Sequence, residues 1–65
     1  MEVDVKKLRG AMMDARLNVR TLSKESGVCP ASINLILNHG KRARIDTIGK
    51  LAAALGISGM ELLKA

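Results

Sequence analysis

The chain has 65 residues, of which 48% are apolar and none is aromatic. This length leaves room for one domain over residues 1–65 with a thin core, because so short a chain buries only about 60% of its unfolded surface. Eleven Lys and Arg against six Asp and Glu give a net charge of +5, which favours a polyanionic partner such as nucleic acid. One His, one Cys and six scattered carboxylates do not supply a walled catalytic cleft, so we expect neither an enzyme nor a cofactor.

Cysteine usage and hydropathy bear on the compartment. The single Cys29 cannot close an internal disulfide, and no Cys or His spacing is typical of a metal site. The first residues do not have the pattern of a secretory signal. The Ala-rich run 51–55 is far shorter than the ~20 residues that span a bilayer. We therefore expect a cytoplasmic protein with no metal and no membrane helix.

Helix starts organise the chain. A polar capping residue that follows one apolar residue and stands four positions before another fixes the entry of a helix. This pattern occurs four times: Val3-Asp4 with Leu8, Leu17-Asn18 with Leu22, Val28-Cys29 with Ile33, and Ile57-Ser58 with Leu62. A further helical pattern of apolar residues ends at Gly56. These signals predict an all-α domain of five helices, over residues 5–16, 19–26, 30–38, 45–55 and 59–64.

The link between the second and third of these helices is the most specific feature. A turn this tight requires a residue that adopts positive φ, and Gly27 stands at that place. Ser23, four residues earlier, is small enough to let the two helices cross closely, and Ile33, six residues later, supplies an apolar wedge. This spacing of Ser23, Gly27 and Ile33 is typical of a helix-turn-helix.

The chain then resembles the Cro and lambda-repressor-like (XRE-type) helix-turn-helix regulators, which are five-helix DNA-binding domains. The resemblance covers nearly the whole chain and depends on Leu17-Asn18, residues 27–38 (GVCPASINLILN), Gly40-Lys41-Arg42, residues 45–55, Gly56-Ile57-Ser58 and Leu62-Leu63. Three positions depart from the family pattern. Ser23 replaces the usual Ala, Cys29 stands in place of a Ser or Thr cap, and Arg44 has no proline before it. Cys29 is interpreted as a small helix-start residue, with a redox-sensitive thiol as the alternative.

The resemblance implies that the third helix reads bases. On a helical wheel its apolar residues Ile33, Ile36 and Leu37 share one side, so the other side is free to enter the major groove. The expected base-reading residues are Pro30, Ala31, Ser32, Asn34, Leu35 and Asn38. Leu35 offers only apolar contact, such as to a thymine methyl; the alternative is a hydrophobic contact within a dimer.

The resemblance also places phosphate contacts in the loop after the third helix and at the start of the second. The expected residues are Asn18, Val19, Arg20, Lys41, Arg42 and Arg44. Lys24 either adds to this basic strip or is simply solvated. Contacts of this kind position a protein on DNA without specifying sequence.

The function expected from the resemblance is a sequence-specific regulator that binds double-stranded DNA, a repressor that acts as a homodimer on a palindromic operator. The dimer contact is expected at Ile57, Met60, Leu62 and Leu63, some of which also belong to the core. Two alternatives remain open. One is an antitoxin-like or controller interaction protein whose DNA binding is autoregulatory and whose main partner is another protein. The other is the DNA-binding piece of a longer repressor.

Overall fold

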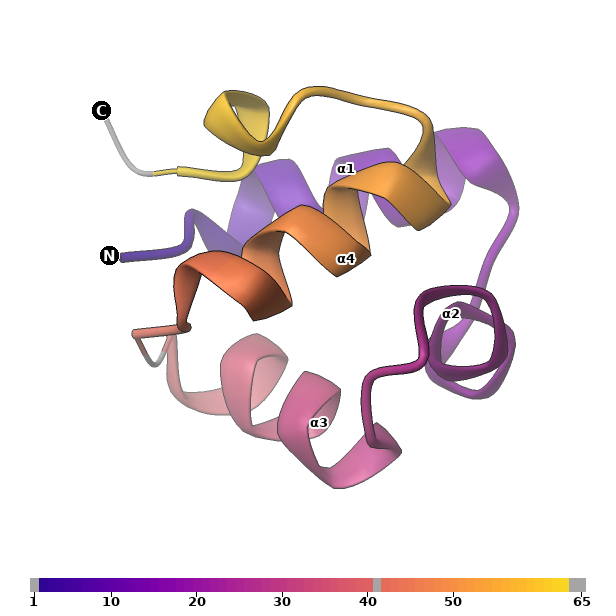
Figure 1. The fold of residues 1–65 in the computed structure, drawn as a ribbon, viewed down its shortest axis with the longest axis horizontal. Coiled ribbons are helices and arrows are strands. Elements are labelled where there is room, and N and C mark those ends of the chain that lie inside the picture. Colours follow the sequence, from indigo (N-terminus) through magenta and orange to yellow (C-terminus); the bar gives the residue numbers. More distant parts are fainter. Residues whose placement is uncertain (1, 41, 64–65) are drawn as a thin grey trace.

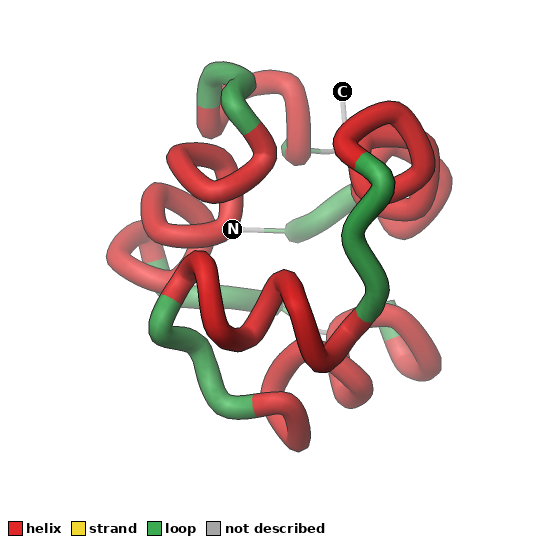
Figure 2. Tube along the Cα trace, turned by 90° about the vertical axis from the view of Figure 1, so that its right-hand side faces the viewer, coloured by secondary structure: helices red, strands yellow, loops and turns green. Residues whose placement is uncertain are grey.

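The computed structural model describes residues 2–40 and 42–63, and its described part is built from helices and connecting loops. The α-helices are α1 (Val5–Ala15), α2 (Val19–Ser26), α3 (Pro30–His39) and α4 (Ile45–Leu55), followed by one short 3-10 turn, η1 (Gly59–Leu62). In Figure 1, α1 lies behind α4 in the upper half of the molecule. Helix α3 lies below them, and α2 lies at the right. Figure 2 shows the same helices from the side, with no strand among the described residues. The expectation of an all-α chain is confirmed.

The predicted capping residues begin the helices. The Asp4 carboxylate accepts hydrogen bonds of 3.0 and 3.2 Å from the amides of Lys6 and Lys7 at the start of α1. Asn18 caps α2 reciprocally with Thr21, whose hydroxyl accepts from the Asn18 amide at 2.8 Å. Both arrangements satisfy amides that the first turn of a helix leaves without acceptors. Cys29 stands at the predicted start of α3, but its side chain makes no capping hydrogen bond.

The prediction of five helices is wrong, because residues 59–64 do not form a fifth α-helix. Ser58 and Glu61 form the predicted capping box, but the turn that they start is the four-residue η1. The chain then becomes extended at Leu63, which pairs with Val3 as an isolated antiparallel bridge, and the Asp4 amide donates to the Leu62 carbonyl oxygen at 2.8 Å. Backbone groups that a longer helix would use are therefore engaged by the N-terminal segment. Residue 64 lies outside the described part of the chain.

Two other boundaries differ slightly from those predicted. The first helix ends at Ala15, one residue early, because Arg16 takes a left-handed conformation with φ of 57°. The third helix continues one residue further, to His39, before Gly40 ends it. The predicted spans 19–26 and 45–55 agree with α2 and α4.

Every helix, including the short turn η1, contributes side chains to one hydrophobic core. The five largest fully buried side chains are Leu8, Leu22, Ile33, Leu51 and Leu62, which come from α1, α2, α3, α4 and η1 respectively. With the other buried residues they form one cluster. Because α3 buries only one side in this cluster, its other side remains on the surface.

Candidate nucleic-acid interface

The turn between α2 and α3 is held by a glycine and two serines. Gly27 has φ of +76°, a conformation that side-chain-bearing residues rarely adopt. The Ser23 hydroxyl donates to the Val28 carbonyl oxygen at 2.6 Å. The Ser26 hydroxyl donates to the Leu22 carbonyl oxygen at 2.6 Å and accepts from the Val28 amide at 3.1 Å. These bonds fix the path of the chain into α3.

The outer side of α3 carries the residues expected to read bases. Ile33 and Ile36 are buried beneath the helix, which fixes its rotation about its own axis. The six expected residues are all exposed: Pro30, Ala31, Ser32, Asn34, Leu35 and Asn38. Leu35 is 44% exposed, so its side chain is partly covered but still accessible from outside. Each of the six residues is thus accessible from outside, and Ile33 and Ile36 are the residues that α3 buries.

The start of α2 offers backbone amides as well as charge. The helix begins with the bond from the Leu22 amide to the Asn18 carbonyl oxygen, so the amides of Val19 and Arg20 precede the intrahelical pattern. Arg20 is exposed and can offer its guanidinium as well as its backbone amide to an anion. Val19 is half-buried, so only its backbone amide can serve as an anion-binding group. The Asn18 side-chain oxygen caps Thr21 at 2.9 Å, which leaves its NH₂ group to donate outward.

The segment after α3 adds two exposed cations, Arg42 and Arg44. Arg42 is held against the N-terminal segment by an isolated bridge to Glu2. Lys41, the third expected phosphate contact here, lies outside the described residues. Lys24 is exposed near the end of α2.

A shallow depression joins the two expected groups of residues. It has a volume of about 200 Å³ and lies between α3 and the start of α4. Its lining consists of Ser32, Leu35, Ile36, Arg42, Ala43, Arg44 and Thr47. Expected base-reading and phosphate-contacting side chains therefore line the same hollow.

Three residues at or behind this surface make contacts that the sequence did not predict. Ser23 was assigned a role through its small size, yet its hydroxyl bonds across the turn. Thr47 lines the depression, and the only sequence signal is its position three residues after Arg44 at the start of a helix. Arg9 on α1 donates to the Leu37 carbonyl oxygen near the end of α3 at 3.4 Å, a contact that joins helices distant in sequence.

The residues expected at a dimer contact are divided by the fold. Met60 is 75% exposed, and Ile57 and Leu63 are half-buried. Leu62 is fully buried in the core of its own chain. This corrects its assignment to a dimer surface, because a side chain without exposed area cannot contact a partner.

In residues 2–40 and 42–63, no three His, Cys, Asp or Glu side chains gather as metal ligands would. No helix in that part of the chain is long and apolar enough to cross a membrane.

Comparisons with known proteins agree with this geometry. A search of curated proteins gave no match. Among solved structures, the chain is similar to part of Streptomyces albus HEPD with substrate 2-hydroxyethylphosphonate and Fe(II) bound, at 30% sequence identity and a TM-score of 0.83. The similarity covers 91% of this chain but only 13% of that one. A family model for the Cro/C1-type HTH DNA-binding domain matches residues 7–65. With nearly its whole length matched, the chain belongs to this family of helix-turn-helix DNA-binding domains.

Proposed function

We propose that this DNA-binding domain is a sequence-specific transcriptional repressor that acts in the cytoplasm as a homodimer on a palindromic operator, without a catalytic role. Reading of bases is assigned to the outer side of α3, and positioning on the phosphate backbone to Arg20, Arg42, Arg44 and the amides that begin α2. Family membership gives DNA binding. Sequence specificity, repression and the dimer are the parts that we propose.

The observation that carries the proposal is the depression shared by α3 and the loop that follows it. A regulator that reads sequence must hold its base-contacting side chains in a fixed register relative to phosphate contacts. Here Ser32 and Leu35 line one hollow with Arg42 and Arg44. A phosphate bound by the two arginines would therefore fix how α3 enters the adjacent groove.

The chemistry of α3 supports sequence readout. Asn34 and Asn38 are exposed amides that can pair with the edge of an adenine, which offers both a donor and an acceptor in the major groove. Ala31 and Leu35 offer apolar contact to a thymine methyl. This side of α3 carries no charged residue, so its contribution to affinity depends on which bases it meets.

A homodimer would double this readout. Two recognition helices related by a two-fold axis read half-sites about 34 Å, or one helical turn, apart. A palindromic operator follows from the symmetry of the protein. The dimer contact predicted around Ile57, Met60 and Leu63 forms part of this proposal, with Leu62 removed.

The test is selection of bound duplexes from a random pool, followed by footprinting on the selected sequence. We expect a two-fold-symmetric motif with half-sites one turn apart. The matched variant Asn34→Ala/Asn38→Ala keeps every positive charge, and we expect it to bind duplex DNA with the same salt dependence but to lose enrichment at the base positions that the two amides read. A pool that shows no motif with the unaltered protein contradicts sequence-specific regulation.

A further inference from the structure

The N-terminal segment before α1, residues 2–4, lies between two parts of the chain that are distant in sequence. Glu2 pairs with Arg42 in one isolated antiparallel bridge, and Val3 pairs with Leu63 in another. Figure 1 shows this segment, at the end marked N, between the loop after α3 and the C-terminal segment. An arginine that is assigned to the phosphate backbone is therefore bridged to an acidic residue at the start of the chain.

Contacts with the core and with η1 fix the path of this segment. Val3 is buried in the core. The Asp4 amide donates to the Leu62 carbonyl oxygen at 2.8 Å, and the Asp4 carboxylate caps α1. The Lys7 amine donates to the Leu63 carbonyl oxygen at 3.4 Å, which ties α1 to the other side of the bridge. The backbone that carries the neighbouring Glu2 is thus anchored to the fold.

The burial of Val3 also decides which way Glu2 points. Successive side chains of an extended segment point to opposite faces, so an inward Val3 turns Glu2 outward. In an antiparallel pair, directly opposed side chains share a face, with Cβ atoms about 4.5–5.5 Å apart. Glu2 and Arg42 are both exposed. The Glu2 carboxylate and the Arg42 guanidinium therefore share the solvent side of the bridge.

Two other described cations lie near this pair. Lys6 lines a hollow of the surface together with Glu2. Arg44 lines the depression beside α3 together with Arg42. The bridge sets Arg42 directly opposite Glu2, whereas Lys6 approaches Glu2 from the first turn of α1. Lys6 is thus the competing partner of Glu2 that an experiment must separate from Arg42.

Two other carboxylates nearby have roles of their own. The Asp4 carboxylate accepts hydrogen bonds from the amides at the start of α1. Asp46 lies in the first turn of α4, where a negative charge favours the helix dipole. Glu2 is the acidic residue that the bridge sets opposite Arg42.

We propose that the Glu2 carboxylate holds the Arg42 guanidinium in the DNA-free domain, and that a phosphate of the duplex displaces Glu2 when it binds Arg42. The inference rests on the proposed function, because it takes Arg42 as a phosphate contact. An ion pair between exposed side chains is weak, so a phosphate can replace the carboxylate. The exchange involves no base, and Glu2 therefore lowers the affinity for every duplex by the same factor.

Fluorescence anisotropy with a duplex that holds a single half-site measures the exchange in one copy of the domain. Glu2→Gln removes the charge and keeps the length of the side chain. We expect it to lower the dissociation constant about twofold to fivefold at low salt, the range that an exposed ion pair supports. The gain should shrink at high salt, because salt screens the pair. An unchanged dissociation constant at low salt overturns the proposal.

A gain of affinity also arises if Glu2 merely repels DNA, and a double-mutant cycle separates the two causes. In the Arg42→Ala background, Glu2 has no guanidinium to hold but still repels phosphate. We expect Glu2→Gln to change the dissociation constant there by less than about 1.5-fold. Lys6→Gln is the matched background and should keep the full gain. A gain that persists without Arg42, or that is lost without Lys6, overturns the proposal.

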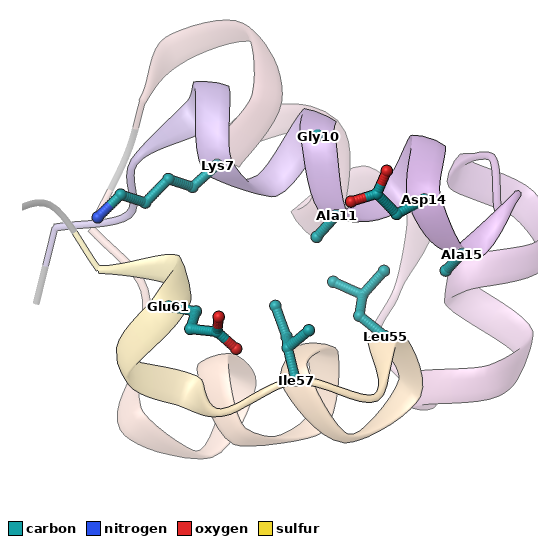
Figure 3. Close-up of a pocket in the computed structure, with 8 residues that line it drawn as sticks. All are labelled: Lys7, Gly10, Ala11, Asp14, Ala15, Leu55, Ile57 and Glu61. Carbon is teal, nitrogen blue, oxygen red and sulfur yellow. The ribbon is translucent and has the colours of Figure 1, made fainter.

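Asp14→Asn controls for the change of net charge. Asp14 is exposed near the end of α1 and lines the groove between α1 and the segment that joins α4 to η1, as Figure 3 shows. This substitution removes the same charge as Glu2→Gln from a residue that is not bridged to Arg42. We expect a smaller gain, of equal size with and without Arg42. A gain as large as that of Glu2→Gln overturns the proposal, because net charge alone then explains the effect.

Nuclear magnetic resonance of the domain without DNA observes the contact directly. The Nε–H signal of Arg42 depends on the partner of the guanidinium. We expect this signal to shift between the unaltered chain and the Glu2→Gln variant, and to keep its position in the Asp14→Asn variant. The same Arg42 signal in all three proteins overturns the proposal. Because Glu2 is exposed, the melting temperature of Glu2→Gln should stay close to that of the unaltered chain.

Failure of this inference can be told apart from failure of the proposed function. Discrimination between sequences is measured as the ratio of affinities for the half-site duplex and an unrelated duplex, and we expect Glu2→Gln to leave this ratio unchanged. A domain that discriminates between the two duplexes but shows no effect of Glu2 rejects the inference alone. A domain whose Arg42 signal responds to Glu2→Gln but which binds both duplexes equally rejects the sequence-specific function alone.

Discussion

The hydroxyl of Ser23 on α2 donates a hydrogen bond of 2.6 Å to the carbonyl oxygen of Val28, across the turn that leads into α3. Ser23 is half-buried and Val28 is buried, so water has little access to this pair. A carbonyl group in such a place is costly to leave without a donor. The bond therefore couples the end of α2 to the orientation of the helix that is expected to read DNA.

Replacing Ser23 by Ala should lower the free energy of unfolding by about 1 kcal/mol, because the Val28 carbonyl loses its side-chain donor. Urea denaturation followed by circular dichroism measures the change. Ser32→Ala, on the exposed side of α3, is the matched control and should change stability by less than about 0.5 kcal/mol. Equal stability of the Ser23→Ala variant and the unaltered chain would show that this bond adds no net stability.

Two glycines with open surroundings should respond to alanine in opposite directions. A Cβ at either Gly27 or Gly49 meets nothing within 4 Å, so neither substitution causes a clash. Gly27 has φ of +76°, where an L-residue is strained, and Gly27→Ala should destabilise the fold by about 1 kcal/mol. Gly49 lies inside α4, and Gly49→Ala should stabilise it by about 0.5–1 kcal/mol. Thermal unfolding measures whether each substitution raises or lowers the melting temperature. A Gly27→Ala variant with a raised melting temperature contradicts the strain argument.

Local signals were enough to predict most of the fold. Asp4 and Asn18 act through hydrogen bonds within three residues, and their apolar neighbours repeat at helical spacing, so the starts of α1 and α2 follow from short stretches of sequence. The same local logic identified Gly27 as the residue of positive φ in the turn.

The errors arose where distant segments meet. The capping box of Ser58 and Glu61 is present, yet Leu63 leaves the helical path to pair with Val3, some sixty residues earlier in the chain. No local pattern encodes that pairing. The groove between α1 and Ile57 and the approach of Thr47 to Leu35 depend in the same way on how the helices pack.

The role of Arg42 at the phosphate backbone predicts a uniform loss of affinity. Arg42→Ala should weaken binding to all duplexes alike and reduce the slope of log affinity against log salt by about 1 per subunit, since one fewer counterion is released. Fluorescence anisotropy at several salt concentrations measures both quantities. Lys50→Ala on α4 removes the same charge from a residue outside the expected contacts and should change the slope less. A variant of Arg42 that loses discrimination between sequences but keeps its slope contradicts a phosphate contact.

Leu35 is the least expected residue on the outer side of α3, because an apolar side chain neither donates nor accepts a hydrogen bond. It is 44% exposed and lies in the depression with Arg42 and Arg44, so a thymine methyl beside a bound phosphate could contact it. We predict that it meets a T·A pair in each half-site, with Asn34 or Asn38 making a polar contact nearby.

Leu35→Ala should leave the domain folded and cost about 1 kcal/mol at one base position, the low end of the range for a single mismatch. Replacing the thymine at that position by uracil removes only the methyl group. The unaltered protein should bind the uracil operator more weakly than the thymine operator, whereas the Leu35→Ala variant should bind both equally, because the variant no longer reaches the methyl. If the unaltered protein binds the two operators with the same affinity, Leu35 does not read a methyl group, and its exposed surface contacts another part of the DNA or another protein.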